Sequence, residues 1–484
     1  MLKDMSLFRQ ACCIGGQWVG ADDGATIAVD NPATGEILGH APRCGRAETA
    51  RAIEAAKNAW PALRAMTALQ RADLLLRWHD LILENKDDLA RLMTLEQGKP
   101  LAEAAGEISY GASFIRWFAE EARRAYGDVI PANVAGRAIL VTREPVGVCG
   151  VITPWNFPMA MLGRKVGPAL AMGCPVVVKP ASQTPFSALA LGELALRAGI
   201  PAGVVNIVTG NARAIGAELT ENPTVRKLSF TGSTEVGKML MAQCAATVKK
   251  VSMELGGNAP FLVFDDADLD AAIAGAMASK YRNSGQTCVC ANRFHVQAGI
   301  HDAFVARLAE AVGKLAVGNG LEPGVNQGPL IDAKAMDRMQ AQLADAVAKG
   351  GRIVCGGKPH PLGGNFFTPT IIADATPDMA FAREEIFGPL APVYRFATEA
   401  EAVALANDTE YGLAAYLYTR DIGRAFRVSG ALEYGMVGVN EGIISCTEAP
   451  FGGVKESGVG REGSRYGMDE YSVMKYTCLG GLAG

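Results

Sequence analysis

The sequence predicts an α/β protein with two doubly wound α/β domains, and two alternating patterns along the chain carry this prediction. In the first, short β-branched runs are separated by stretches of helical periodicity, which is typical of a parallel sheet covered by helices on both faces. The runs lie at residues 146–152, 174–179, 203–208 and 226–231, and the helical stretches at 159–172, 185–198, 212–221 and 234–246. A second alternation begins at residues 261–264 and continues to about residue 440.

The remaining elements follow from the same periodicities. Residues 46–60 and 69–95 have apolar side chains at i, i+3 and i+4, which predicts helices ahead of the first alternation. Within the second alternation, helices are expected near residues 268–282, 301–315 and 332–349. Residues 138–143 resemble a strand, although polar and charged residues flank it instead of another apolar unit.

Composition and charge exclude several classes of protein. Hydrophobic residues make up 49% and charged residues 20% of the 484 positions, as in ordinary soluble globular proteins. The formal net charge is -4, so no basic field favours nucleic acid or anionic lipid. No apolar run approaches the roughly 18 residues of a membrane helix, and the first residues lack the apolar core of a signal peptide. We therefore expect a cytoplasmic protein with reduced thiols.

The 11 cysteines have no regular spacing, so they do not form a disulfide framework. Cys149 and Cys174 lie in apolar stretches and are expected to fill the core. Cys288 and Cys290 lie among polar residues and glycines, and we expect a thiol to be reachable only there. His295 is the only histidine nearby and no second Cys-x-x-Cys occurs, so no metal site is expected. A structural disulfide between Cys288 and Cys290 would be strained. The third possibility is that Cys288 is a nucleophile and Cys290 its neighbour.

Ligands of open α/β sheets bind at the carboxyl ends of the strands, so the loops after the predicted strands are the candidate sites. Asn156 lies between two prolines in TPWNFP (153–158), where its amide could donate to a developing oxyanion or only shape an Asx turn. Lys179 and Ser182 follow the next strand in KPASQTP (179–185). They could bind a phosphate, or be a solvated strand end and a helix cap.

Later loops add further candidates. Gly232 begins a G-x-x-x-x-G turn at a helix start, where main-chain N–H groups could hold a pyrophosphate. The G-x-G-x-x-G at 458–463 does not follow a β-branched run, so we interpret it as a loop. Glu254 ends a strand-like run among apolar residues, which would raise its pKa and suit a general base, unless an ion pair holds it.

Taken together, these loops resemble the NAD(P)-dependent aldehyde dehydrogenase superfamily, from about Ile14 to the C-terminus. The matching sequences are PWNFP, KPASQTP, FTGSTEVG, MELGGNAP, GQTCVCANR, EEIFGP (384–389) and PFGGVKESGVGREG (450–463). The resemblance implies the aldehyde dehydrogenase fold, with a Rossmann-like cofactor-binding domain, a catalytic domain and a small β element that bridges the subunits of a homodimer or homotetramer. The resemblance implies that the cofactor-binding domain comprises residues 1–127 and 146–255 and the catalytic domain residues 256–440. The bridging β element would comprise residues 128–145 and 470–484.

The resemblance also implies roles for the candidate residues. Cys288 would be the nucleophile and Glu254 the base, and Asn156 would form the oxyanion hole with the Cys288 N–H. Attack on the aldehyde would give a thiohemiacetal, its hydride would pass to the nicotinamide, and water activated by Glu254 would hydrolyse the resulting thioester. The implied cofactor groove contains Trp155, Lys179, Ser182, Gly232, Ser233, Leu255, Glu385 and Phe387.

Two features refine the cofactor and the substrate. NAD-preferring relatives often have a glutamate where this chain has Ser182, so Ser182 with Lys179 predicts NADP, with NAD used less efficiently. The segments 163–174, 280–290 and 440–453 resemble the succinate-semialdehyde dehydrogenase group. The resemblance implies a carboxylated aldehyde held by Arg164, Arg282 and Ser445.

Several alternatives remain open at this point. Each arginine could instead form a salt bridge with a neighbouring helix, and residues 446–448 differ from those expected, so glutarate semialdehyde or a simple aliphatic aldehyde is also possible. A catalytically retired binding protein would be expected to lack Cys288, Glu254 or Asn156, and an acylating dehydrogenase would lack Glu254. Cys290 would be a redox switch that oxidises with Cys288, or only a small packing residue.

Overall fold

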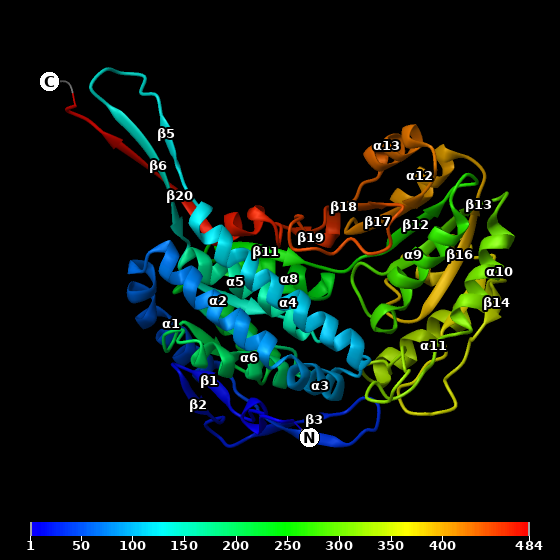
Figure 1. Cartoon of the computed structure of the whole chain (residues 1–484), viewed down its shortest axis with the longest axis horizontal. Helices are drawn as coiled ribbons and strands as arrows, with labels where there is room; N and C mark the ends of the chain where they lie inside the picture. The colour runs from blue at the N-terminus through cyan, green and yellow to red at the C-terminus, as the bar shows by residue number, and fades with distance from the viewer. Residues whose placement is uncertain (1, 483–484) are drawn as a thin grey trace.

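In this computed structural model, residues 2–482 are described; Met1 and residues 483–484, which belong to the predicted first domain and bridging element, lie outside them. The described chain forms two lobes and a projecting arm (Figure 1). The first lobe contains an eight-stranded sheet in the order β19-β11-β10-β7-β8-β9-β1-β2. Its parallel strands are β7 (Val148–Ile152), β8 (Val176–Lys179), β9 (Val205–Ile207), β10 (Val225–Thr231) and β11 (Lys250–Glu254). Antiparallel strands complete its edges: β1 (Cys12–Ile14), β2 (Gln17–Val19) and β19 (Gly458–Val459).

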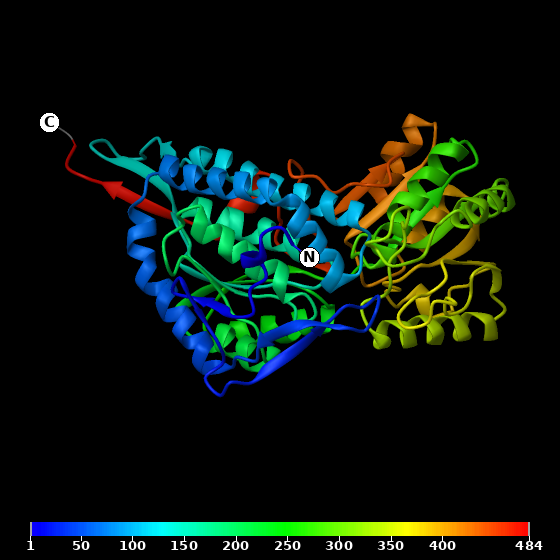
Figure 2. The ribbon, with the colours of Figure 1, turned by 60° about the horizontal axis from the view of Figure 1, so that its bottom comes forward.

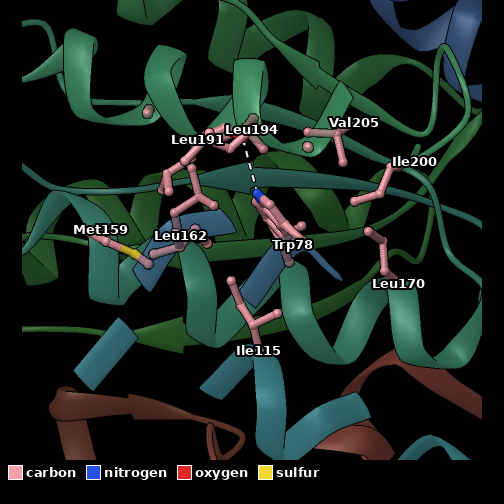
Figure 3. Close-up of a cluster of buried hydrophobic side chains, with 14 of the residues drawn as sticks. Trp78, Ile115, Met159, Leu162, Leu170, Leu191, Leu194, Ile200 and Val205 are labelled. Atoms are coloured by element: carbon pink, nitrogen blue, oxygen red, sulfur yellow. Dashed lines mark hydrogen bonds between the residues drawn. The ribbon is translucent and has the colours of Figure 1, made fainter. Parts of the chain in front are cut away.

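Helices cover both faces of this sheet because successive strand residues point to opposite sides. Val176 and Val178 pack into one core cluster, while Val177 packs into another. The first cluster takes side chains from α2 (Ala68–Glu84), α3 (Lys86–Gln97), α4 (Leu101–Glu121), α5 (Pro158–Met172) and α6 (Pro185–Arg197). The second takes them from α1 (Arg46–Ala65), α7 (Ala212–Glu221) and α8 (Thr234–Ala245). Figure 3 shows Trp78 in the first cluster, where its indole N–H donates to the Leu191 carbonyl at 3.1 Å.

The second lobe contains a seven-stranded sheet in the order β14-β15-β16-β13-β12-β17-β18, parallel except at β14. Its strands are β12 (Ala259–Val263), β13 (Ala291–Gln297), β14 (Arg352–Cys355), β15 (Thr370–Ala373), β16 (Leu390–Phe396), β17 (Ala414–Tyr418) and β18 (Met436–Val439). The helices are α9 (Leu269–Tyr281), α10 (His301–Val312), α11 (Ala333–Ala348), α12 (Glu399–Asn407) and α13 (Ile422–Ala431). Both predicted alternations are therefore present.

The arm is a three-stranded antiparallel sheet that extends away from the first lobe in both views (Figures 1 and 2). It consists of β5 (Asp128–Ile130), β6 (Ala138–Pro145) and β20 (Ser472–Leu479). Apolar side chains on it are exposed, with Val129 at 80% and Met474 at 75%. A hairpin of β3 (Thr26–Asp30) and β4 (Ile37–Pro42) completes the strands. Short 3-10 helices are η1 (Met5–Leu7), η2 (Ala122–Arg124), η3 (Arg282–Gly285), η4 (Ala380–Ala382), η5 (Lys455–Ser457) and η6 (Arg465–Tyr471).

Two sequence predictions need correction. The long helical stretch at 69–95 is two helices, because Asn85 leaves the helical conformation between α2 and α3 and its side chain donates to the Leu81 carbonyl. The segment 458–463 is not only a loop, since Gly458 and Val459 form the edge strand β19 beside Met253 and Glu254. Among the described helices, none is long and apolar enough to cross a membrane.

Candidate active site

Eight of the predicted site residues gather where the carboxyl ends of the first lobe's strands face the second lobe. A cavity of about 210 Å³ lies there. It is lined by Pro154, Trp155, Asn156, Thr231, Gly232, Ser233, Leu255, Gly256, Cys288, Arg338, Glu385 and Phe387. Three larger surface hollows, of about 350, 630 and 680 Å³, contain none of the predicted residues, so size alone would have misplaced the site.

Cys288 lies in the loop between η3 and β13 and is half-buried against the cavity. The loop turns sharply, because Asn283, Ser284 and Gly285 all have positive φ (50°, 55° and 74°). A Cβ on Gly285 would lie 2.2 Å from the Gly388 carbonyl oxygen, so only glycine fits. Burial raises the pKa of the Cys288 thiol to about 12, although Arg164 opposes the shift. The resting sulfur is therefore protonated, and its proton must leave when it reacts.

Asn156 is 3% exposed and its amide orientation is fixed by two contacts. Its Oδ1 accepts from the Phe157 N–H at 3.1 Å, and its Nδ2 donates to the Gln286 carbonyl at 3.1 Å. An amide nitrogen carries two hydrogens, so one N–H remains for a group in the cavity. The local contact to Phe157 resembles the turn alternative, and the free N–H suits the oxyanion alternative.

Glu254 is the last residue of β11 and is 2% exposed. Neither carboxyl oxygen has a hydrogen-bond partner in the described chain, and Oε1 lies beside Gly452 instead of lining the cavity. Burial raises the pKa of Glu254 well above its usual value and nearby Glu462 raises it further, while Arg164 opposes the shift. Glu254 is thus a buried acid without an ion pair, and its surroundings favour the neutral carboxyl over the carboxylate.

The cofactor candidates divide into two groups. Gly232 and Ser233 precede α8, and no side chain caps this helix start, so its N–H groups are open to an anion. Lys179 ends β8 outside the cavity; burial lowers its pKa to about 8, and no described residue forms an ion pair with it. Half-buried Ser182 follows it, also outside the cavity. A buried, unpaired ammonium and an uncapped helix start fit the phosphates of a dinucleotide.

The opposite wall would contact a nicotinamide. The rings of Trp155 and Phe387 pack edge to face, with centroids 5.5 Å apart. Glu385 accepts the Gly257 N–H at 3.0 Å, and burial raises its pKa to about 7. Arg338 also lines the cavity, although no sequence pattern singled it out.

The predicted carboxylate ligands differ from one another. Arg164 is buried with its Nε 2.8 Å from Glu462 Oε2, so the salt-bridge alternative holds for this residue. Arg282 is half-buried over the Phe157 ring at 5.2 Å and forms no ion pair or hydrogen bond with a described residue. Both lower the pKa of the Cys288 thiol and so lie near it. Ser445 is half-buried in a loop, away from the 210 Å³ cavity.

Cys290 does not match the expectation of a reachable thiol. It is 1% exposed, and its sulfur donates weakly to the Lys280 carbonyl at 3.5 Å. Burial raises the pKa of Cys290, whereas the buried Lys280 ammonium lowers it. The exposed cysteines are instead Cys446 and Cys478. The prediction that a thiol could be reached only at positions 288 and 290 is therefore wrong.

Several buried groups near the site were missed. Glu462 pairs with Arg164 and Lys165, and it belongs to the G-x-G-x-x-G segment that we interpreted as a loop. The hydroxyl of Tyr110 is buried without a hydrogen-bond partner in the described chain. Burial raises the pKa of Tyr110, and Arg164 and Arg282 oppose the shift, so the hydroxyl lies near both guanidiniums. The helical periodicity around Tyr110 does not indicate that its hydroxyl lies near the two arginines.

Comparison with known proteins agrees with this geometry. The model of the aldehyde dehydrogenase family matches residues 18–477. A glutarate-semialdehyde dehydrogenase of Pseudomonas aeruginosa is 64% identical, over 99% of this chain and 100% of that protein. A succinate-semialdehyde dehydrogenase [NADP(+)] of Escherichia coli is 62% identical, over 99% of each chain. A 3-sulfolactaldehyde dehydrogenase of Pseudomonas putida is 60% identical, over 99% of each chain.

Solved structures confirm the predicted fold. An E. coli NADP-dependent enzyme superposes with a TM-score of 0.99 at 61% identity, covering 99% of this chain and 100% of that one. A succinate-semialdehyde dehydrogenase from Burkholderia pseudomallei gives a TM-score of 0.98 at 62% identity, covering 99% of each chain. The family model and these full-length similarities show that the chain belongs to the aldehyde dehydrogenase family, whose members are NAD(P)-dependent enzymes.

Proposed function

We propose that this aldehyde dehydrogenase oxidises succinate semialdehyde to succinate, with NADP as the preferred cofactor. One observation carries the substrate class: the guanidinium of Arg282, over the Phe157 ring next to Asn156, has no ion-pair or hydrogen-bond partner in the described chain, and neither has the buried Tyr110 hydroxyl. A carboxylate at the far end of a short aldehyde would give these two donors the partner they lack, while Arg164, held by Glu462, would add its charge. Ser445 would complete the contact. The named relatives act on semialdehydes of dicarboxylic acids or on a sulfonated aldehyde, all of which are anionic.

The chemical steps follow from the residues around the cavity. Cys288 attacks the aldehyde carbon as its thiol proton passes to solvent, and the resulting oxyanion accepts from the free Asn156 N–H and from the Cys288 main-chain N–H. When bound, the nicotinamide accepts the hydride. Glu254 then takes a proton from the water that hydrolyses the thioester, which requires its carboxyl to be deprotonated first. Because Cys288, Glu254 and Asn156 are all present, a retired binding protein has no support, and Glu254 argues against transfer to coenzyme A.

The cofactor preference rests on the loop after β8. The buried ammonium of Lys179 and the hydroxyl of Ser182 would bind a 2′-phosphate. Position 182 carries no carboxylate, so nothing there would repel that phosphate. The uncapped start of α8 would hold the pyrophosphate. A similar protein is named as NADP-dependent, which agrees with this assignment.

The domain division and the assembly are part of the same proposal. The cofactor-binding domain would comprise residues 1–127 and 146–255, the catalytic domain 256–440, and the bridging element 128–145 with 470–484. Exposed apolar side chains on the arm, such as Val129, Met474 and Tyr476, would be covered by a second subunit in a homodimer or homotetramer.

Glutarate semialdehyde is the second candidate, because a relative with that name is 64% identical. A direct test measures absorbance of the reduced nicotinamide with succinic semialdehyde, glutaric semialdehyde and hexanal, each with NADP and with NAD under a reductant. We expect the highest kcat/KM for succinic semialdehyde with NADP. A preference for glutaric semialdehyde would change the assigned substrate and keep the proposed anion contact. Equal rates with hexanal would refute the anion contact.

A further inference from the structure

The junction between α3 and α4 contacts both loops of the proposed active site. Its side chains belong to the first lobe and include Gln97, Lys99, Glu103 and Glu107. One of the loops is the oxyanion loop (residues 153–158), which follows β7. The other is the nucleophile loop (residues 282–290), which enters the second lobe. No residue of this junction was singled out by the sequence.

Lys99 makes the central contact. Its side chain is buried, and its ammonium donates to the main-chain carbonyl of Asn156 at 2.7 Å. The same ammonium pairs with Glu107 Oε2 and lies over the Phe157 ring, 4.0 Å from the centroid. Burial lowers the pKa of Lys99 and Glu107 opposes that shift. A buried cation with these partners fixes the position of the Asn156 peptide group.

Glu107 fixes the next residues of the oxyanion loop. Its Oε1 accepts the main-chain N–H groups of Met159 and Ala160, at 3.0 and 3.2 Å. These are unpaired donors at the first turn of α5, so Glu107 caps that helix. The loop is thus held at the Asn156 carbonyl by Lys99 and at the start of α5 by Glu107.

The nucleophile loop is tied to the same junction. Gln97 Nε2 donates to Asn283 Oδ1 at 3.0 Å, and the Asn283 N–H donates to Glu103 Oε2 at 2.8 Å. Asn283 Nδ2 donates in turn to the Asn156 carbonyl at 3.1 Å. That carbonyl therefore accepts from both Lys99 and Asn283. Asn283 has a left-handed backbone conformation, and these contacts stabilise it.

We propose that Lys99, paired with Glu107, is a positioning residue that aligns the Asn156 amide with Cys288 across the two lobes. The inference rests on the proposed oxyanion role of Asn156. Lys99 touches the main chain of Asn156 and not the reacting atoms, so it acts through the direction of the Asn156 side chain. A donor displaced by about 1 Å loses much of its catalytic value, because oxyanion contacts depend steeply on geometry.

The test is a double-mutant cycle in the full-length enzyme, using any aldehyde that the wild type oxidises. We expect Lys99→Met to lower kcat by about 10- to 100-fold, with KM for the aldehyde and Kd for NADP nearly unchanged. Combined with Asn156→Ala, it should cause almost no further loss, since both changes remove the same contact. If the two losses multiply instead, Lys99 does not act through Asn156 and the inference is overturned.

Two further variants separate positioning from folding. Lys99→Met leaves Glu107 buried without its cation, so the pair Lys99→Met/Glu107→Gln should fold more stably and yet remain slow. Recovery of wild-type kcat by this pair would overturn the inference. The matched control is Lys249→Met, because Lys249 is also a buried lysine that donates to main-chain carbonyls, those of Asn222 and Val225, at 2.7 and 2.8 Å. It lies at the amino end of the sheet, so it should lower stability without lowering kcat.

The outcome also distinguishes this inference from the proposed function. If Asn156→Ala alone retains wild-type kcat, the proposed oxyanion role is wrong, and the inference fails with it. A slow Asn156→Ala with a multiplicative double mutant refutes only the positioning role of Lys99. Should Lys99→Met not fold, Glu107→Gln enters the same cycle, because its amide oxygen can still cap α5 while the partner charge is lost.

Discussion

The nucleophile loop (residues 282–290) and the mouth loop (residues 440–449) both carry residues proposed to bind the substrate, and they are built very differently. Asn283, Gln286 and Ser284 in the nucleophile loop are buried and each hydrogen-bonds to other segments. In the mouth loop, Ser445 is half-buried, Cys446 is exposed, and neither forms a hydrogen bond with a described residue. The loop is anchored at Asn440, whose side chain hydrogen-bonds to the Thr419 main chain, and at Thr447, whose carbonyl accepts the Ser464 N–H.

This difference separates chemistry from selectivity. A loop that carries the reacting sulfur must hold its geometry, so its positive-φ residues are fixed by many contacts. A loop that only contacts the far end of the substrate can change with less cost. Relatives at 60–64% identity are named for glutarate semialdehyde, succinate semialdehyde and 3-sulfolactaldehyde, which agrees with one reaction and a variable anion contact.

The largest expected effect comes from the nucleophile loop. Cys288→Ala should lower aldehyde oxidation by about 10⁴-fold or more, because no other side chain in the cavity can form the covalent intermediate. Steady-state absorbance of the reduced nicotinamide measures the loss. Binding of NADP, followed by tryptophan fluorescence, should be unchanged. Substantial turnover by this variant would refute the nucleophile assignment.

Glu254→Gln should be the next largest change, with kcat lower by about 10²- to 10⁴-fold. Acylation would still proceed, so a rapid mixing experiment should show a burst of one reduced nicotinamide per site before the slow phase. In the wild type, the raised pKa of Glu254 means that the base form appears only as pH rises, so kcat should fall toward acid pH. Loss of both the burst and turnover would place Glu254 in the first half of the reaction instead.

Arg282→Ala tests the anion contact that the nucleophile loop itself is proposed to make. It should raise KM for succinic semialdehyde by about 10- to 100-fold, because a hydrogen bond to a charged group is lost, and leave KM for hexanal nearly unchanged. Arg282→Lys is the matched control, because it keeps the charge but lacks the paired N–H donors. Its KM for succinic semialdehyde should lie between those of the wild type and Arg282→Ala. If KM rises equally for both aldehydes, Arg282 supports the loop and does not bind the anion.

Much of the site could be predicted because its residues follow consecutive strands. Asn156, Gly232 and Leu255 come after β7, β10 and β11, whose carboxyl ends meet at one edge, so local motifs located them. The contacts of Lys99 with Asn156 could not be predicted, since a lysine that reaches a carbonyl 57 residues away leaves no periodic pattern. Glu462 could not be identified either, because the glycine-rich segment that contains it was compared only with the dinucleotide-binding motif.

Burial was the other property that local sequence could not give. Cys290 lies among polar residues and glycines, yet it is packed beneath the nucleophile loop because α9 and β13 enclose it. The burial of Cys290 depends on tertiary packing, which residue type and spacing do not determine. The break between α2 and α3 is local instead: no proline or glycine marks it, and the Asn85 side chain donates to the Leu81 carbonyl where the helix ends.

The smallest change in untreated activity is expected for Cys290→Ala, because the Cys290 sulfur donates to main-chain carbonyls below the loop and does not line the cavity. After mild peroxide treatment, however, the variant should stay active while the wild type loses activity that a reductant restores. A disulfide with Cys288 would form within the turn closed by the Cys290 N–H and the Thr287 carbonyl, at 3.1 Å. Cys446→Ala, in the exposed mouth loop, should remain as sensitive as the wild type. If peroxide inactivates Cys290→Ala as strongly as the wild type, Cys290 is a packing residue and not a redox switch. The nucleophile loop would then keep its resting conformation under oxidation.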